Sequence, residues 1–517
     1  MTLSIVFAAT ILLAAAGAWR WRAAGSGSPG EQILRLGFSL PAVFCLLLFC
    51  AYSVAYAQSD SWSFIRLAPA IAQSWGTSLY HQDGKGPLLG WSYGPVMPLL
   101  NLPLGVFTDP SVALAASSLM GLAVLLLPLL LSIWRSMPPT PEHRVIGILI
   151  LAAVQAILMH CDVSLYWLRR IQVDVYAMGL CQLGFVVLLK ANPNQLLTNR
   201  ERWMSAAFFV ASAFSKHNEV VLAAIPIGYV WLRDGRLPAL RMTFALAVLG
   251  LAGFLLCIAC WGWEAVFLNL WLVPARHPWA APGILGLTIA AERFLDLVRT
   301  GLVVFLAMAA CDPWLGARSR NFREWVAERP WVLPAAAALV IFPVSLVGRI
   351  KIGGDENSFH SVYFMAVAAG MIAARWTTQS APAALRRFVP GLACIVAVVG
   401  SLLYDPGTQS LDAQFRDSQL RREYRFAREH PGQVWFGADP LVTLYTDGKA
   451  YHQGYGVYDR TLPNLPPTPR QLREHLPSGL RWVSTPLSPF WRPEGLVPIR
   501  PPAGINKDSW FEVQSGG

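Results

Sequence analysis

Residues 36–57 read LGFSLPAVFCLLLFCAYSVAYA, and the polar stretch QSDSWSF follows at residues 58–64. The first segment has no charged side chain and is long enough to cross a bilayer as a helix, which takes about 20 apolar residues. Asp60 therefore lies just outside a predicted membrane span. An ionised group so close to hydrocarbon costs several kcal/mol unless it is paired or hydrated, so Asp60 is a candidate functional residue.

The whole chain has the composition of a membrane protein. Of its 517 residues, 55% are hydrophobic and only 14% are charged, whereas a soluble domain carries about 25% charged residues. The apolar residues fall into blocks, and hydropathy along the chain gives about twelve spans. We therefore predict an all-α polytopic membrane protein with about twelve transmembrane helices.

Basic residues set the predicted orientation of these helices. Every second connection between spans is rich in arginine and lysine, and the positive-inside rule puts these connections in the cytoplasm of a plasma (inner) membrane. They are residues 20–35, 135–144, 190–202, 233–241, 318–329 and 375–387. The extracytoplasmic side then holds the N-terminus and residues 58–108, 161–171, 216–218, 262–294, 349–358 and the C-terminal tail.

The formal net charge of +11 fits the same topology. Basic loops at a membrane surface contact anionic lipids, and the sequence contains no nucleic-acid-binding motif. We therefore expect membrane lipids, and no nucleic acid, among the partners of this protein.

The sequence divides into two predicted domains. Residues 1–404 form a multi-pass transmembrane domain that includes the outer loop 58–108, and residues 405–517 form a small soluble extracytoplasmic α+β domain. Within the loop, apolar residues at helical spacing over 64–75 predict an amphipathic helix on the membrane, and residues 93–107 predict a short helix that turns back. In the tail, short β-like runs between Pro and Gly turns predict strands at residues 434–436, 441–445, 482–484 and 511–513.

Polar residues at the outer ends of the spans form the candidate site. A carboxylate in such a place can remove a proton from an acceptor hydroxyl or amine, and basic groups can hold a phosphate. Structural alternatives remain for each residue. Asp60 can simply cap the following helix, Arg169 and Arg170 can anchor lipid headgroups, and Lys216 can pair with Glu219.

The segment from Lys351 to His360 is richer in polar groups than a turn requires. It reads KIGGDENSFH, with two glycines that allow a tight turn. Asp355, Glu356 and His360 offer ligands for a divalent cation, although no fixed zinc-type spacing is present, and metal binding is the minor alternative. No P-loop, G-x-S-x-G or Rossmann fingerprint occurs in the chain, so neither ATP-driven nor serine-hydrolase chemistry is supported.

Several of these motifs together resemble a known family. The order of Asp60, a helix, the Gly-x-x-x-Tyr of residues 76–80 and the Tyr-Gly-Pro of residues 93–95 is similar to the first outer loop of GT-C membrane glycosyltransferases. The similarity is to the branch of the protein O-mannosyltransferases and aminoarabinose transferases. Further matches are FSKHNE at 214–219 and KIGGDEN at 351–357. The family often has Asp-Glu at the first acid, whereas Ser61 follows Asp60 here, which argues against a two-acid mechanism in this loop.

The resemblance implies a transferase that takes a sugar from a polyprenyl-phosphate donor to a glycan, lipid or protein acceptor on the outer face. Asp60 is then the general base. The residues for the donor phosphate are Lys216, Arg169, Arg170 and Lys351. The residues for the sugar or the acceptor are Tyr93, Asp355, Glu356, Asn357 and His360. Two other functions stay open: a transporter or lipid flippase, and a non-catalytic membrane assembly protein.

Overall fold

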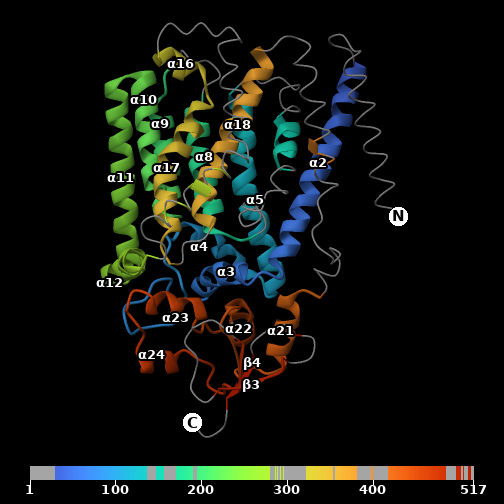
Figure 1. Ribbon diagram of the computed structural model, residues 1–517, viewed down its shortest axis with the longest axis vertical. Helices are drawn as coiled ribbons and strands as arrows, with labels where there is room; N and C mark the ends of the chain where they lie inside the picture. Colours follow the sequence, from blue (N-terminus) through green and yellow to red (C-terminus); the bar gives the residue numbers. More distant parts are fainter. Residues whose placement is uncertain are drawn as a thin grey trace.

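The computed structural model describes residues 29–136, 147–155, 170–189, 195–279, 322–352, 356–380, 417–484, 496–501 and 510–513, with a few single residues between these ranges. Helices that run along the long axis of the molecule make up most of it, and a small sheet lies at one end (Figure 1). The long helices are α2 (Pro29–Ala57), α5 (Pro110–Arg135), α8 (Val173–Leu188), α9 (Asn199–Ala213), α10 (Ala224–Asp234), α11 (Arg236–Trp261), α17 (Val332–Arg349) and α18 (His360–Ser380).

Several of these helices have the length and composition of membrane spans. Within the described ranges, α5, α11 and α17 are long and apolar enough to cross a membrane, and α2 with the following α3 (Ser61–Ser74) forms a fourth candidate that is bent by 83°. The chain is thus a membrane protein, as predicted. The expected total of about twelve spans remains a prediction, because the spans predicted at 2–19, 295–312 and 388–404 lie outside or almost outside the described residues.

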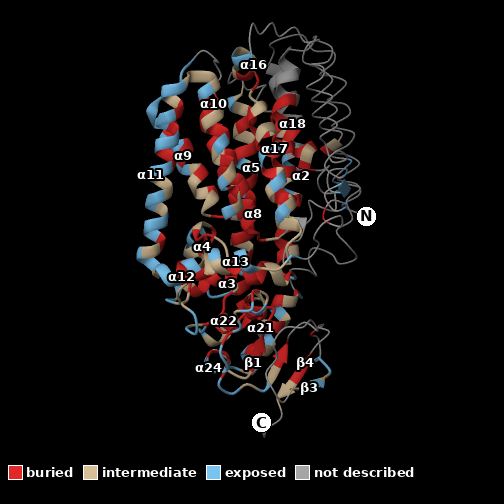
Figure 2. Cartoon of the chain, turned by 60° about the vertical axis from the view of Figure 1, so that its left-hand side comes forward, coloured by how far each residue is buried: buried red, intermediate tan, exposed pale blue. Residues whose placement is uncertain are grey.

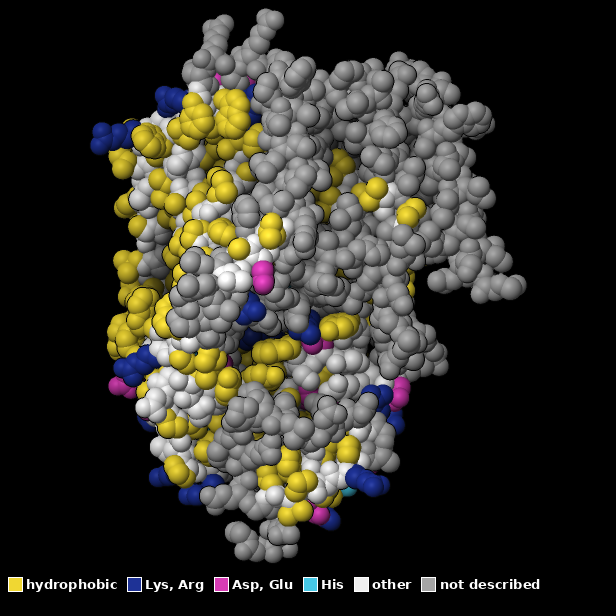
Figure 3. Space-filling model, in the orientation of Figure 1, with side chains coloured by type: hydrophobic (Ala, Val, Ile, Leu, Met, Phe, Trp, Pro, Cys, Tyr) yellow, Lys and Arg dark blue, Asp and Glu magenta, His cyan; other side chains and the backbone are white. Residues whose placement is uncertain are grey.

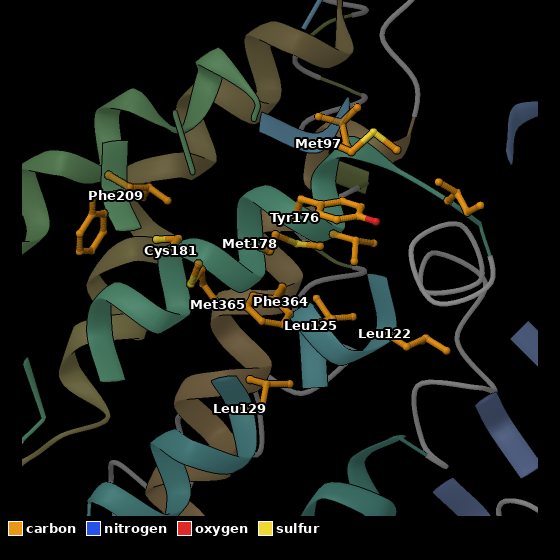
Figure 4. Close-up of a cluster of buried hydrophobic side chains, with 14 of the residues drawn as sticks. Met97, Leu122, Leu125, Leu129, Tyr176, Met178, Cys181, Phe209, Phe364 and Met365 are labelled. Atoms are coloured by element: carbon orange, nitrogen blue, oxygen red, sulfur yellow. The ribbon is translucent and has the colours of Figure 1, made fainter. Parts of the chain in front are cut away.

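Helix α8 is the centre of the bundle. It packs against α5, α9 and α18, and nearly all of its side chains are buried, whereas α11 presents an exposed face at the edge (Figure 2). Figure 4 shows Met178 and Cys181 of α8 among Leu125, Phe364 and Met365 of its neighbours. Some buried polar groups in this core bond across helices, for example the Gln182 amide to the Ser132 hydroxyl at 2.6 Å.

A layer of short helices lies between the bundle and the sheet. It contains α3, α4 (Val96–Asn101), η1 (Leu102–Val106), η3 (His217–Ala223), α12 (Trp263–Phe267), η4 (Leu268–Leu272) and α13 (Val273–Arg276). The helices predicted near 64–75 and 93–107 are confirmed as α3 and as α4 with η1. However, the expected surface position of α3 is wrong: residues 63–72 are all buried, because α4, η1 and a helix of the C-terminal segment pack over it.

The C-terminal segment, residues 417–513 as far as they are described, combines helices with the sheet. Its helices are α21 (Gln419–Glu429), α22 (Pro440–Asp447), α23 (Gly454–Thr461) and α24 (Pro469–Glu474), and its strands are β1 (Val434–Phe436), β2 (Trp482–Ser484), β3 (Leu496–Ile499) and β4 (Trp510–Val513). The strand order is β1-β2-β4-β3, with β1 and β2 parallel and the other pairs antiparallel.

Three of the four strands predicted in the tail are confirmed as β1, β2 and β4. The strand predicted at 441–445 is wrong, because this run forms helix α22. Pro440 supplies the helix-compatible φ of a first turn, and Gly448 ends the helix in the left-handed conformation. The predicted boundary at residue 405 lies outside the described residues and remains a prediction.

The described connections between helices lie at two opposite ends of the bundle. Near the sheet lie the α2–α3 corner, the start of α8, the η3 turn and the start of α18, whereas α16 (Phe322–Glu328) lies at the opposite end (Figure 1). Hydrophobic side chains cover much of the described helix surface, and Lys, Arg, Asp and Glu gather where the helices meet the C-terminal segment (Figure 3). The polar groups predicted for one face of the membrane are thus at one end of the molecule.

Candidate active site

Asp60 lies at the corner between α2 and α3 and begins α3 as its N-cap. Its Oδ2 accepts hydrogen bonds from the backbone N–H of Ser63 at 2.9 Å and from the Ser63 hydroxyl at 2.8 Å. The Ser63 hydroxyl in turn accepts from the N–H of Ile171 at 3.1 Å. The capping alternative is therefore confirmed as one role of Asp60, and the same contact joins α3 to the segment before α8.

The second oxygen of the same carboxylate forms an ion pair. Oδ1 of Asp60 is 3.1 Å from Nε of Arg170, and only 7% of the Asp60 side chain is exposed. Arg170 also donates to the Tyr56 hydroxyl at 3.3 Å. Burial raises the pKa of Asp60, and the positive charge of Arg170 opposes that shift. Both carboxylate oxygens are thus held in place, with a cation beside the acid.

Lys216 belongs to a second, more deeply buried cluster. Its Nζ donates to the Asp174 carboxylate at the start of α8 and to the backbone oxygen of Asn357 at 3.4 Å. Glu219 does not take the ion pair with Lys216 that its spacing allows, and instead accepts a hydrogen bond from the Ser361 hydroxyl. The cluster therefore joins three predicted outer connections, namely those before α8, α10 and α18.

Tyr93 contacts Arg66 of α3 and lies near Lys216 of the second cluster. Its hydroxyl accepts from the Arg66 guanidinium at 3.3 Å, and its ring lies 4.7 Å from the centre of that guanidinium. Lys216 is close enough to Tyr93 to interact with it electrostatically. The turn after Tyr93 is fixed by Gly94, whose position leaves no room for a Cβ against the backbone oxygen of Phe214. A methyl group there would lie 1.8 Å from that oxygen.

Lys351 lies apart from both clusters. Its Nζ donates to the backbone oxygens of Pro274 at 3.2 Å and Ala275 at 3.1 Å, and it lies 5.4 Å from the centre of the Trp279 ring. These contacts tie the turn after α17 to the segment after α13. Within the ranges that the structure describes, no ion pair joins Lys351 to an acid.

Several predicted site residues have no described side chain. Arg169 and Asp355 lie outside the described residues, and for Glu356 only the backbone is described. His360 is fully buried at the start of α18 and interacts electrostatically with Asp174. In the described part of the chain no three His, Cys, Asp or Glu side chains are grouped to hold a metal ion, and the cation alternative with Asp355 and Glu356 remains a prediction.

Comparison with solved structures gives three relevant matches. ArnT from Cupriavidus metallidurans bound to undecaprenyl phosphate has a TM-score of 0.54 and 12% sequence identity, over 95% of this chain and 99% of ArnT. ArnT in the apo state has the same TM-score and identity, over 93% and 98%. The archaeal oligosaccharyltransferase AglB from Archaeoglobus fulgidus, with an inhibitory peptide and a dolichol-phosphate, has a TM-score of 0.40 and 11% identity, over 86% and 69%. No protein-family model and no curated protein sequence matches the chain.

The match to ArnT extends over almost the whole of both chains. At 12% identity it establishes the fold alone, and ArnT is a membrane glycosyltransferase of the GT-C superfamily. The chain has the fold of ArnT. The resemblance found in the short sequence motifs is confirmed at this level. In this fold, Asp60 and Arg170 form one group. Lys216, Asn357 and His360 belong to a second group, and Tyr93 lies near Lys216.

Asp174 was among the polar residues at the outer ends of the predicted spans but had no assigned role, and three further residues of this region, Arg66, Tyr455 and Asp459, were not predicted as site candidates. Asp174 follows a polar connection and was one of several acids there, without a spacing that marks it as the partner of Lys216. Arg66 could have been found, since it is the single charge in the apolar run 64–72 of the predicted helix. Tyr455 and Asp459 carry no local signal, because they reach the site only through the packing of α23.

Proposed function

We propose that this protein is a GT-C glycosyltransferase that transfers a sugar from a polyprenyl-phosphate donor to an acceptor on the extracytoplasmic face of the membrane. The observation that carries the proposal is the buried Asp60 carboxylate, fixed by Ser63 and Arg170 at the end of the bundle where the other polar groups gather. The fold supports it, since the ArnT that matches this chain was solved with undecaprenyl phosphate bound.

In the proposed reaction Asp60 is the general base. Its carboxylate takes the proton from an acceptor hydroxyl or amine, and the acceptor atom forms a bond to the anomeric carbon of the sugar. The bond between that carbon and the phosphate oxygen breaks, and the polyprenyl phosphate leaves with the electron pair. Because burial raises the pKa of Asp60, its carboxylate is a stronger base than an exposed aspartate, which favours proton transfer.

The basic residues have the complementary task. Arg170, Lys216 and Lys351, with Arg169, bind the donor phosphate and stabilise the charge that develops as it leaves. Tyr93, Asn357 and His360, with Asp355 and Glu356, line the sugar or acceptor side. Arg170 is the best placed of the cations, because it already contacts the proposed base. The guanidinium of Arg170 would both hold the Asp60 carboxylate in place and stabilise the negative charge of the departing phosphate.

The test compares Asp60→Asn with Asp109→Asn. Asp109 is also an N-cap, of α5, and its carboxylate accepts from the Ser111 N–H at 2.7 Å. Asparagine caps helices about as well as aspartate, so both variants keep the cap and lose a charge. General bases contribute about 10²–10⁴-fold to rates, so Asp60→Asn should lose transfer by that factor and Asp109→Asn should keep it.

The assay supplies purified protein in vesicles with polyprenyl-phosphate sugars and measures transfer to extracted envelope glycans and lipids by mass spectrometry. Full transfer by Asp60→Asn would remove Asp60 as the base. Equal losses in both variants would mean that the charge at an N-cap, and not the base, accounts for the effect.

A further inference from the structure

A short helix leaves the end of α11 at a sharp corner. Gly262 forms this corner with a φ of 80°, in the left-handed region that favours glycine. The helix then runs without a break from α12 through η4 to α13, because the residues at both junctions keep helical backbone angles. Figures 1 and 2 show α11 along the long axis of the molecule and α12 turned across it at its lower end. We call residues 263–276 the corner helix.

The corner helix has two different faces. On one face Ala265 and Val273 are buried, and the Asn269 amide donates to the backbone oxygen of His81 at 3.0 Å, so this face packs against the protein. The other face carries three aromatic side chains four residues apart, a spacing that places them on one side of a helix. This aromatic stripe consists of Trp263, Phe267 and Trp271, which are 53%, 38% and 67% exposed.

The aromatic stripe continues the apolar surface of α11. Helix α11 is long and apolar enough to cross a membrane, and its exposed side chains include Phe244 and Leu251. The ring of Phe254 lies 6.2 Å from that of Trp263, which stacks on Phe267 at 5.4 Å. In Figure 3, hydrophobic side chains line the edge of the molecule along α11, and charged side chains begin at its lower end. The surface of α11 that faces lipid therefore extends onto the corner helix.

The length of α11 sets the depth of the corner. Its 26 residues span about 39 Å as an α-helix, whereas the hydrocarbon core is about 30 Å thick. Gly262 therefore lies at the boundary between hydrocarbon and headgroups, where tryptophan rings are favoured. Glu264 and Arg276 are exposed near the two ends of the corner helix, and such charges are costly inside the hydrocarbon.

We infer that the corner helix lies in the membrane surface next to the C-terminal segment, with the aromatic stripe immersed between the lipid headgroups and the acyl chains. Its partner is the lipid bilayer, and the arrangement is that of an interfacial amphipathic helix. The inference goes beyond the proposed function and does not depend on it, because no residue of the stripe belongs to the candidate site.

The packed face gives this position a consequence for the rest of the molecule. Asn269 holds the outer loop at His81, and Lys351 donates to two backbone oxygens of α13, which ties the turn after α17 to the same helix. The ring of His277, the next residue, has its Nε2 3.3 Å from the backbone oxygen of Asp459 on α23. An immersed corner helix therefore fixes the height of these three segments above the bilayer.

The test measures the depth of the stripe in a bilayer. A fluorescent naphthyl amino acid replaces Trp271 in the full-length protein, which is reconstituted in phosphatidylcholine vesicles. Its quenching is compared between lipids brominated near the headgroup and lipids brominated near the end of the acyl chain. The label should lose more emission to the shallow bromines, because an interfacial helix enters only the outer part of the acyl region.

Two exposed apolar positions serve as controls. A label at Leu251, near the middle of α11, should lose more emission to the deep bromines, and a label at Val497 on β3 should lose none to either lipid. A second protein carries the label at Phe267, so that a folding defect at one stripe position does not decide the result, and size-exclusion elution checks each variant.

Three results would overturn the inference. Unquenched labels with red-shifted emission would place the stripe in water. Unquenched labels with blue-shifted emission would mean that a second copy of the chain or another protein covers it. Quenching mainly by the deep bromines, as at Leu251, would place the corner helix in the hydrocarbon core. Shallow quenching in a protein that transfers no sugar would support the inference and count only against the proposed function.

Discussion

Acidification should loosen the contact between the C-terminal segment and the outer loop, because His452 makes both of its hydrogen bonds only as a neutral ring. Its Nδ1 accepts from the Leu88 N–H at 3.0 Å, and its Nε2 is 3.0 Å from the backbone oxygen of Gln471. An oxygen there requires the proton on Nε2. A second proton on Nδ1 would point at the Leu88 N–H, and the contact would be lost.

The size of the effect follows from the pKa of His452. Burial lowers this pKa from 6.5 to about 4, and neighbouring His475 and His81 add to the shift. Between these pH values the unfolded chain binds a proton that the folded ring does not. The contribution of His452 to the free energy of unfolding is therefore fully present above pH 6.5 and is lost as the pH decreases towards 4. With 1.36 kcal/mol for each pKa unit, the loss is about 2 kcal/mol at pH 5 and about 3 kcal/mol below pH 4.

Hydrogen exchange read by mass spectrometry tests this directly. Peptides from residues 79–92 and 449–476 are followed at pH 7.5 and pH 5, after correction for the intrinsic exchange rate. A loss of about 2 kcal/mol corresponds to a roughly thirtyfold higher opening equilibrium. His452→Gln can keep one donor and one acceptor but does not titrate, so its opening should change less with pH, and His430→Gln on α21 is the control. Equal pH responses in wild type and His452→Gln would refute the reasoning.

Two further changes probe the packing around the site. Gly94→Ala should destabilise the protein by about 1–3 kcal/mol because the new methyl group collides with the Phe214 backbone. Gly228→Ala is the control, because the space around Gly228 is open. Thermal unfolding compares the two variants, and equal melting temperatures would contradict the close approach at Gly94. Lys216→Met should lower the free energy of unfolding by about 3–5 kcal/mol because it leaves Asp174 as a buried charge without its cation. The double variant with Asp174→Asn should recover most of that loss in the same assay. No recovery would mean that the ion pair is not the cause of the loss.

Much of the fold could be predicted from the sequence, because the hydropathy of the chain and its local helix and turn signals indicate the same elements. The corner at Asp60, the helix after it and three strands of the tail were all predicted, since a cap, a helical period or a turn-bounded run marks each of them. The error at residues 441–445 has a physical reason. A run of β-branched and aromatic residues favours a strand, but Pro440 and Gly448 begin and end a helix there. In so short a segment these terminal residues outweigh the strand preference of the residues between them.

The candidate site was only half predictable. Charged residues at the ends of spans stand out in an apolar sequence, and this found Asp60, Arg170 and Lys216. Their pairing was not predictable, because the sequence does not give the register of α8 against α9 that sets Asp174 beside Lys216. The contribution of α23 was invisible for a related reason, since polar residues in a tail of ordinary composition do not reveal which of them face the membrane domain.

The contact between Trp62 and Tyr455 affects how the protein folds during its synthesis. Trp62 lies early in the described chain and Tyr455 lies late. The ring of Trp62 therefore lacks this partner until α23 has been synthesised and has packed against α3. A nascent chain that ends before α23 would leave this side of α3, close to Asp60, uncovered.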